Sequence, residues 1–394
     1  TSLYGSSAAN GVILITTKKG KKGRDVVNFS LQTGISQRGV PEYNRVGIAD
    51  YYLLNWEALR NGRITSGAST TTALANAWAT DNLISNLGVN VYKNVANNAI
   101  VVNGAVASDQ TLKYNDFDWA RPLFKAGLRQ SYDLNYAGGS ERTTYFASLG
   151  YLNDQGYLVK SGLERFTARL NVESQLKSWV KVGINLAATN TRTENSYNGA
   201  DNNTAIINPY RFSRSIGPIY SPYVHNADGT NVFDANGDKV YEWQSTRGAN
   251  ASTGRNSIYE RMLNSDINKA NNITSRVFAD FNLLEGLKLS IIGGYDLRNS
   301  YNKEYQNNVL GDAAPAGAAS RETNNTYSVN FIQLLNYTKK IGSHNIDVLV
   351  GHESNKYTFE YFYGYKQGQV GANNDDLVNF ITPTSLTSYT DTYN

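Results

Sequence analysis

The sequence contains no cysteine, no run of eighteen apolar residues and little charge, and each absence excludes a class of protein. Without cysteine the chain can form no disulfide framework, thiolate metal site or cysteine nucleophile. The lack of thiols also fits a chain that passes through an oxidising compartment. Without a long apolar run it has no transmembrane helix. Charged residues make up 18% and the net charge is +4, which is too small to indicate nucleic acid binding.

Aromatic residues are plentiful, with 28 Tyr, 13 Phe and 5 Trp. Such a composition is typical of two kinds of β-rich protein. One is a soluble all-β glycan-binding protein or adhesin. The other is a membrane β-barrel, in which half of each strand is polar and averaging hides the lipid-facing half. Composition alone leaves both open.

Nine stretches of alternating apolar and polar residues predict an all-β fold. In one of them Phe166, Ala168 and Leu170 share one side of a strand, while Thr167 and Arg169 share the other. About ten such residues can cross a bilayer as a tilted strand. The predicted strands are Val26–Arg38, Gly127–Gly138, Arg142–Asn153, Leu163–Gln175, Trp179–Thr193, Asn271–Leu284, Leu287–Tyr301, Thr326–Lys339 and Asn345–Tyr365.

The connections between these strands alternate in length. The short ones follow the second, fourth, sixth and eighth strands and have the length of hairpin turns. Those after the first, fifth and seventh strands are much longer, and the third is modest. Outer-membrane barrels have short periplasmic turns and longer outside loops, so odd-numbered strands are expected to run outward. A soluble sandwich has no reason to place its long loops at one end, and the order therefore favours a multi-pass barrel in a cell outer membrane. The short connections are Gly139–Glu141, Leu176–Ser178, Glu285–Gly286 and Lys340–His344.

The long loops have structure of their own. Apolar residues at helical spacing predict a helix over Ile48–Arg60 and a weaker one over Thr72–Ile84. In the fifth loop, the segment Asp234–Asp238 resembles a calcium-binding loop in composition, but its residues do not have the spacing of EF-hand ligands. An Asn236-Gly237 hairpin turn is preferred there, although a loop calcium site stays open, and we expect no other cofactor.

Two groups of side chains are candidates for contact with a transported molecule. Aromatic residues of the fifth loop could stack on sugars or peptide side chains, or could only pack the loop or meet a partner lid. Polar strand residues could line the lumen, or could only hydrate it or brace a plug. The loop candidates are Tyr220, Tyr223, Tyr241 and Trp243; the lumen candidates are Arg169, Glu173, Lys181 and Asp296.

The last predicted strand carries an aromatic residue at every second position from 357 to 365. On a strand these side chains share a face, and Tyr is favoured at the membrane interface because its ring is apolar and its hydroxyl is wet. A sandwich core or a stacking surface for sugars would give the same pattern. We expect an outer membrane girdle formed by Tyr357, Phe359, Tyr361 and Tyr363.

No catalytic constellation is present, and we expect no enzyme. The three histidines are His225 in a loop, His344 in a short turn and His352 within a strand. The turn and the loop should lie on opposite sides of the membrane, so we do not expect the histidines to share a metal site. We expect instead that they are solvated or packed against other residues.

The predicted sheet cannot close by itself. Single-chain bacterial barrels have an even number of strands, whereas nine are predicted and the last runs outward without a return. An open sheet in lipid leaves rows of unpaired backbone groups, each costing several kcal/mol. The sequence also begins at Thr1 without a signal peptide. Either the chain is a fragment of a larger barrel, which we expect, or the count of nine strands is wrong.

Two segments carry a resemblance to a known family. YGSSAANGVILITTKKG, Tyr4–Gly20, contains Tyr4, Gly5 and the turn dipeptide Asn10-Gly11, and resembles the end of the plug in SusC/RagA-like TonB-dependent outer-membrane transporters of Bacteroidota. Asp116–Leu186 is similar to the early barrel strands of that family, with its DW, GGS and GY elements in order.

The resemblance implies an organisation and a function. Residues 1–23 would be the plug end and linker, and residues 24–394 the N-terminal part of a plugged barrel of about 22 strands. The whole protein would import an oligosaccharide or peptide across the outer membrane, together with a SusD-like surface lipoprotein and energised by the TonB-ExbB-ExbD complex. The alternatives are the soluble glycan-binding protein or adhesin and a passive porin, and the plug-end segment argues against the porin.

Overall fold

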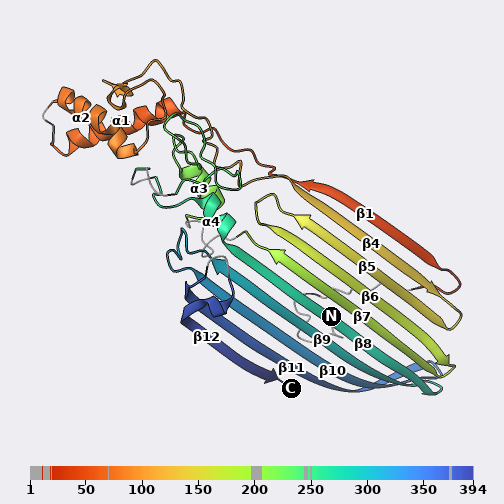
Figure 1. Cartoon of the computed structure of the whole chain (residues 1–394). Coiled ribbons are helices and arrows are strands. Elements are labelled where there is room, and N and C mark those ends of the chain that lie inside the picture. The colour runs from red at the N-terminus through yellow and green to blue at the C-terminus, as the bar shows by residue number, and fades with distance from the viewer. Residues whose placement is uncertain are drawn as a thin grey trace.

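In a computed structural model, the chain forms one large antiparallel sheet and a separate domain built from its loops (Figure 1). The structure describes residues 11, 18, 20–69, 71–196, 206–243, 247–248, 251–371 and 375–393. No helix among these residues is long and apolar enough to cross a membrane. The ten strands follow each other in chain order across the sheet: β1 (Val26–Ser36), β4 (Gly127–Gly139), β5 (Thr143–Gln155), β6 (Gly162–Lys177), β7 (Val180–Glu194), β8 (Ser265–Leu284), β9 (Leu287–Gln306), β10 (Ala318–Ile341), β11 (His344–Gln369) and β12 (Phe380–Tyr393).

All nine predicted strands are confirmed, but a tenth strand was missed. β12 returns along β11, with Tyr357 opposite Tyr393 and Tyr361 opposite Tyr389. The prediction that the ninth strand has no return is therefore wrong, and so is the argument from an odd count. The sheet is nevertheless open, since β1 and β12 form its two edges. The run Val12–Thr17, which its short length and β-branched residues predict to be a further strand, lies outside the described residues.

The short and the long connections between the strands lie at opposite ends of the sheet. The links β4–β5, β6–β7, β8–β9 and β10–β11 are hairpin turns at one end, which we call the turn end (Figure 1). Gly286, in the turn after β8, has φ +78°, a conformation that glycine adopts readily. All longer connections leave from the opposite end, which we call the loop end. The structure therefore has the predicted separation of short and long connections at the two ends of the strands.

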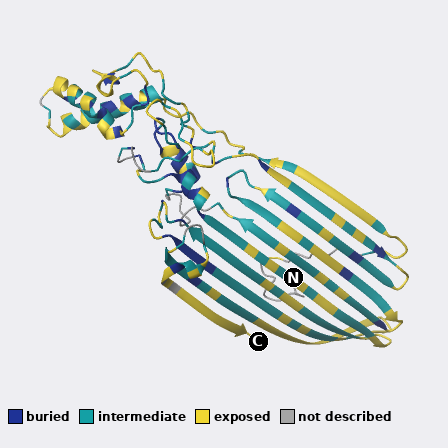
Figure 2. Cartoon of the chain, in the orientation of Figure 1, coloured by how far each residue is buried: buried dark blue, intermediate teal, exposed yellow. Residues whose placement is uncertain are grey.

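One face of the sheet is apolar from β1 to β10. Directly opposite residues of an antiparallel pair lie on the same face, so the strand register defines rows that cross the sheet. Many large apolar side chains of this face are exposed, and exposed residues of both faces appear as yellow bands on the strands in Figure 2. One row, from β1 to β10, consists of Phe29, Leu134, Leu149, Ala168, Ala188, Ile273, Leu297 and Tyr327.

The other face is polar, and it carries the predicted lumen residues. The register row through Arg169 passes through Asp296 on β9. Lys181 forms an ion pair with Glu173 on the same face, with Nζ and Oε2 2.9 Å apart. On this face Asn171 donates a hydrogen bond to the carbonyl of Lys18, 3.2 Å away. The polar face is therefore the face that the N-terminal segment contacts.

The register contradicts the prediction of an aromatic girdle. The row through Arg169 and Asp296 continues to Ser328 and then to Tyr357 on β11. No register shift separates this position from Phe359, Tyr361 and Tyr363, so all four aromatic residues lie on the polar face. The sequence prediction failed because a period of two separates two faces without saying which face is which.

A domain at the loop end combines the connection between β1 and β4 with that between β7 and β8. The two predicted helices are confirmed and extend slightly further than expected. Thr71 caps α2 by accepting a hydrogen bond from the backbone of Leu74, and Gly88 ends it at φ +79°. The elements of this domain are α1 (Ile48–Thr65), α2 (Thr72–Leu87), a 3₁₀ turn (Asn97–Ala99), β2 (Val101–Val102), β3 (Ala105–Val106), α3 (Pro209–Ser215) and α4 (Ser257–Leu263). Outside this domain, a second 3₁₀ turn (Leu377–Asn379) precedes β12.

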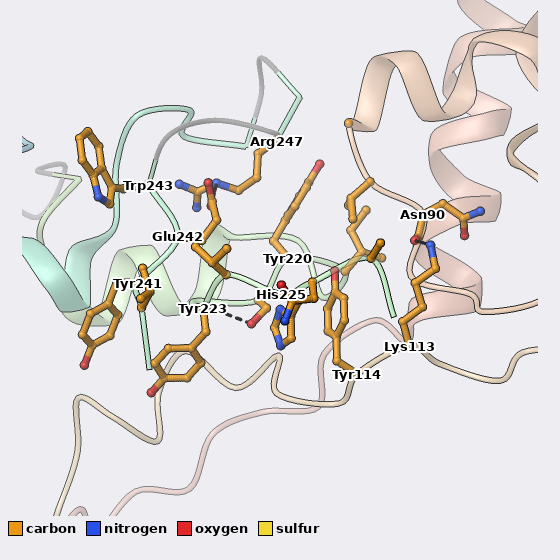
Figure 3. Close-up of a pocket in the computed structure, with 18 residues that line it drawn as sticks. Asn90, Lys113, Tyr114, Tyr220, Tyr223, His225, Tyr241, Glu242, Trp243 and Arg247 are labelled. Carbon is orange, nitrogen blue, oxygen red and sulfur yellow. Dashed lines mark hydrogen bonds and ion pairs between the residues drawn. The ribbon is translucent and has the colours of Figure 1, made fainter. Parts of the chain in front are cut away.

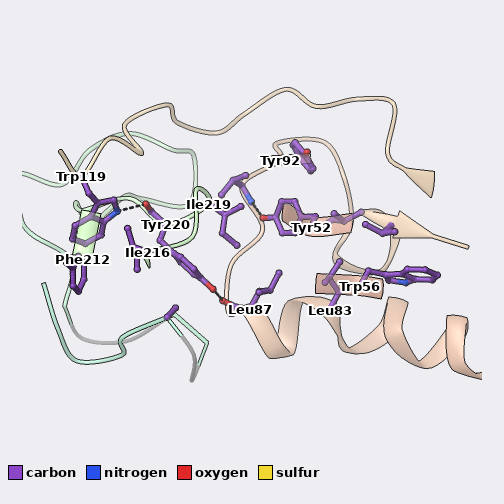
Figure 4. Packing of buried hydrophobic residues seen from close by; sticks show 14 of the residues in the cluster. Tyr52, Trp56, Leu83, Leu87, Tyr92, Trp119, Phe212, Ile216, Ile219 and Tyr220 are labelled. Carbon is purple, nitrogen blue, oxygen red and sulfur yellow. Dashed lines mark hydrogen bonds between the residues drawn. The ribbon is translucent and has the colours of Figure 1, made fainter. Parts of the chain in front are cut away.

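This loop domain has a hydrophobic core that joins both connections (Figure 4). Trp119, from the first connection, donates a hydrogen bond from Nε1 to the carbonyl of Tyr220 in the second, at 2.8 Å. The hydroxyl of Tyr220 donates in turn to the carbonyl of Leu87, at 2.9 Å. Tyr52 and Trp56 of α1 are fully buried beside them. Each such side chain contributes roughly 1.5–3 kcal/mol by burial, so the core holds segments distant in sequence in one arrangement.

Candidate functional site

A pocket of about 610 Å³ opens in the loop domain between the end of α2 and a hairpin of the second connection (Figure 3). The hairpin spans residues 221–243, and its backbone folds back twice, as shown by the bonds from Val224 to Val240 and from Val232 to Val224, at 2.9 and 3.0 Å. Gly229 and Gly237 supply the positive φ angles, +90° and +83°, that its two turns require.

The predicted Asn236-Gly237 turn is confirmed. Oδ1 of Asp234 accepts hydrogen bonds from the backbone N–H groups of Asn236 and Asp238, both at 2.9 Å. This arrangement is a side-chain-capped turn. Within the described residues no group of three or more His, Asp or Glu side chains is placed to hold a metal ion.

Aromatic rings form much of the pocket wall. Tyr223 and Tyr241 face each other across the hairpin, with ring centroids 5.3 Å apart. Tyr241 also stacks on Tyr259 of α4, at 5.1 Å and 16°. Burial raises the pKa of Tyr241 to about 12, so its hydroxyl stays protonated and can donate a hydrogen bond at neutral pH. The wall can therefore offer flat apolar surface together with hydroxyl groups.

A charged cluster fixes the opposite side of the pocket. Nε2 of His225 lies 2.9 Å from Asp116, and the imidazole stacks on Tyr114 with centroids 3.8 Å apart. Nζ of Lys239 lies 3.1 Å from the same carboxylate, and Ser221 donates to it at 3.0 Å. Burial by itself would raise the pKa of Asp116, but these hydrogen bonds outweigh it and lower the pKa to about 2. The carboxylate therefore ties the hairpin to the first connection.

A buried ion pair closes the floor. Nε of Arg247 lies 3.0 Å from Oε2 of Glu242, and the Arg247 side chain is only 2% exposed. Burial lowers the pKa of this guanidinium, against the opposing charge of Glu242. The guanidinium carbon also lies 5.6 Å from the centre of the Trp119 ring. An arginine held between a carboxylate and an indole is fixed in place and carries directed N–H groups.

The structure brings all four predicted loop aromatics to this one pocket, in two different settings. Tyr220 is buried, and its hydroxyl is used inside the core, so its ring serves packing. Tyr223, Tyr241 and Trp243 are half-buried and line the pocket with part of their surface. Whether they contact a transported molecule stays a prediction.

Sequence reasoning missed the polar half of the pocket. Tyr114 and Asp116 belong to a segment about a hundred residues before the hairpin, and no periodicity links them to His225 or Glu242. Only the DW element at Asp118-Trp119 pointed to this region. His225 is packed as preferred, while His352 pairs with Gln333 on the sheet at 2.8 Å.

Of the plug-end motif, Tyr4, Gly5 and Asn10 lie outside the described residues. Gly11 is described, and its φ of +107° is one that glycine adopts readily. Its role stays a prediction.

Comparisons with known proteins agree with the fold. No family model matches the chain. It is 24% identical to TonB-dependent receptor P3 of Formosa agariphila over 90% of this chain and 29% of the relative. It is 25% identical to TonB-dependent receptor SusC of Bacteroides thetaiotaomicron over 94% of this chain and 32% of the relative. The chain thus spans about a third of the length of these relatives.

A solved structure shows the same fold. The RagAB peptide transporter superposes with a TM-score of 0.65 and 23% sequence identity, covering 99% of this chain and 41% of that chain. A second solved structure, of the RagAB peptide importer in the open-open state, gives the same TM-score. The resemblance to SusC/RagA-like TonB-dependent transporters, drawn from Tyr4–Gly20 and Asp116–Leu186, is confirmed, and the open sheet is a part of their barrel fold.

Proposed function

We propose that this chain supplies the plug end and the early barrel strands of an active importer in the outer membrane of a Bacteroidota-like cell. The observation that carries the proposal is the two-faced sheet: one face is apolar from β1 to β10 and exposed, and the other is polar and contacts the N-terminal segment at Lys18. Residues 1–23 then belong to the plug and residues 24–394 to the barrel.

The two ends of the sheet give the orientation. Short turns face the periplasm and long loops face outward in bacterial barrels, so the loop domain and its pocket stand outside the cell. In a closed barrel every strand edge is paired, and the edges of β1 and β12 would pair with further strands of the whole protein. The apolar face then meets outer-membrane lipid.

The pocket is proposed as a contact site for the imported molecule, an oligosaccharide or a peptide. Half-buried Tyr223, Tyr241 and Trp243 offer ring surface, while the hydroxyls and the fixed Arg247 offer directed hydrogen bonds. A SusD-like lipoprotein covers the loop domain from outside, and the TonB-ExbB-ExbD complex pulls the plug to admit the molecule.

The apolar face also supports this proposal over a soluble glycan-binding protein or adhesin. Side chains such as Phe29, Leu149 and Phe166 are each more than half exposed on this face, which is far more contiguous apolar surface than a soluble monomer carries. A passive porin would need no plug end and no energy source.

Deletion of the intact gene tests the proposal. Uptake of labelled oligosaccharides and peptides is compared in wild-type and deleted cells, with and without a protonophore that discharges the inner membrane. Entry of at least one nutrient class should fall on deletion and in wild-type cells treated with the protonophore. Tyr223→Ala with Tyr241→Ala should reduce that entry, whereas Tyr43→Ala, at an exposed position before α1, should not. If the entry of every nutrient is unchanged after deletion of the gene, the proposal is wrong.

A further inference from the structure

Six aromatic side chains gather on the polar face where β11 and β12 run side by side. Tyr361 lies opposite Tyr389, with ring centroids 5.2 Å apart, and Phe359 lies 5.8 Å from the ring of Tyr389. Phe359 and Tyr361 are stacked at 6.4 Å and 19°. We call this group the aromatic track: Tyr357, Phe359, Tyr361, Tyr363, Tyr389 and Tyr393.

The track does not face lipid. Its side chains share the face of Arg169 and Asp296, as the register shows. The opposite side of the same segment of β11 carries Lys356, Thr358 and Glu360, which are unsuited to hydrocarbon. An apolar surface therefore faces the lumen at this height, and the outer side of β11 is polar from Lys356 to Glu360.

The track is also clear of the N-terminal segment's contact at Lys18. The row through Asn171, which binds the Lys18 carbonyl, reaches β11 at Asn355, on the turn side of the track. From Tyr357 the track extends away from that row towards the loop end. Tyr357, Tyr389 and Tyr393 are exposed, and the other three rings are half-buried.

The surroundings of the track are rich in carboxylates and amides. Glu322 lies opposite Tyr363 and Asn324 opposite Tyr361, and the amide of Asn324 donates to Glu322 at 2.9 Å. Asp391 lies opposite Phe359. The nearest cation in these rows is Arg298, two strands from Phe359, while Arg165 and Arg169 lie further away on β6. The wall thus combines flat rings with many hydrogen-bond acceptors and donors and with a local excess of negative charge.

We infer that the aromatic track binds a neutral oligosaccharide as it enters the barrel. The inference rests on the proposed import function and names its substrate class. Alternate residues of a strand are about 6.8 Å apart, so the four rings of β11 form a track of about 20 Å that suits an extended chain. Sugar rings offer apolar faces to aromatic rings, and their hydroxyls need acceptors such as carboxylates. The carboxylates Glu322 and Asp391 disfavour an anionic glycan.

The test uses the full-length transporter in detergent, with its lipoprotein partner. The probes are arrays of neutral oligosaccharides and of uronic-acid oligosaccharides, both of four to eight sugar units, and a library of peptides of similar length. Binding constants are compared for the wild type, Tyr361→Ala with Tyr389→Ala, and Tyr361→Phe with Tyr389→Phe. Phe362→Ala, at the neighbouring position on the opposite face of β11, is the matched control.

The wild type should bind neutral oligosaccharides in preference to uronic-acid ones. Loss of two rings should weaken that binding about 10- to 100-fold, at about three- to tenfold for each ring. The phenylalanine pair and Phe362→Ala should stay within about threefold of the wild type. If the double alanine variant fails to insert, Tyr389→Ala alone, which removes a single ring, carries the test with about a three- to tenfold loss.

Three results would overturn the inference. The first is the absence of any neutral oligosaccharide among the bound probes. The second is neutral binding that the alanine variants leave unchanged. The third is peptide binding that depends on the two rings, which would make the track a peptide site. If one of these three results is found and uptake nevertheless disappears on gene deletion, the inference about the track is wrong while the proposed import function is still supported. Failure of the inference and failure of the proposed function are therefore distinguishable.

Discussion

Lowering the pH from 4 to 2 should loosen the pocket hairpin, because Asp116 loses its charge in that range. Its carboxylate accepts hydrogen bonds from Ser221 and Lys239 and forms the ion pair with His225. Together these hold its pKa at about 2, against an ordinary value of 3.8. In the opened hairpin the carboxyl titrates near the ordinary value. Its stabilisation is therefore complete above about pH 4 and is lost as the pH falls towards 2.

The size of the effect follows from the two pKa values. A tenfold change in proton affinity corresponds to about 1.4 kcal/mol, so a fall from 3.8 to about 2 corresponds to about 2 kcal/mol. The Asp116 side chain is 21% exposed, and solvent screens part of the interaction. We expect the opening free energy of the hairpin to fall by about 1 kcal/mol between pH 4 and pH 2.

Hydrogen exchange measured by mass spectrometry, corrected for the pH dependence of intrinsic exchange, reports the opening of residues 221–243. Asp116→Asn should lower the opening free energy at pH 5 and should remove most of its dependence on pH. Asp81→Asn, at an exposed position of α2, is the control and should behave as the wild type. An Asp116→Asn hairpin that still loosens between pH 4 and pH 2 as the wild type does would refute the reasoning.

Three further substitutions test the sheet and the core, each in the full-length protein. Gly286→Ala puts a Cβ 2.2 Å from a backbone carbonyl of β10 and should reduce the heat-modifiable folded band sharply; Gly342→Ala, a turn glycine with open space around it, should reduce it less. Val350→Lys, on the apolar face, should cost about 2–4 kcal/mol of unfolding free energy in urea titrations of vesicle-inserted protein, whereas Leu349→Lys, equally exposed on the polar face, should cost less than about 1 kcal/mol. Tyr220→Phe should cost about 1 kcal/mol of opening free energy at the end of α2, measured by hydrogen exchange, because the carbonyl of Leu87 loses one of its two donors and keeps only the backbone N–H of Gly248.

The strands and helices could be predicted because their signals are local. The alternation within Leu163–Gln175 and the helical spacing of Ile48–Arg60 each depend on neighbours a few residues away. β12 was missed because Phe380–Tyr393 consists largely of Thr and Ser and includes Pro383, so its alternation is weak. Proline is tolerated at irregularities of a sheet, and the register of β11 and β12 shifts where Lys366 lies opposite Pro383.

The pocket could be predicted only in part, because its two halves come from different connections. Tyr223, Tyr241 and Trp243 were found as a cluster of aromatic residues in one loop. Tyr114 lines the same pocket, and Asp116 contacts its residue His225, because contacts such as Trp119–Tyr220 bring the two connections together. A contact of that kind leaves no periodic signal in the sequence, since it depends on tertiary packing.

The reversal of polarity along β11 is itself contained in the sequence. Val348 and Val350 occupy even positions, whereas Tyr357 and Tyr361 occupy odd ones. A strand without an inserted residue cannot place both pairs on one face, so the sequence requires either a bulge between them or a change of surroundings along the strand. The register is continuous from His344 to Tyr365, which excludes the bulge. The surroundings must therefore change: the apolar side faces outward near the turn end and inward near the loop end, where a molecule entering the barrel would first meet the wall.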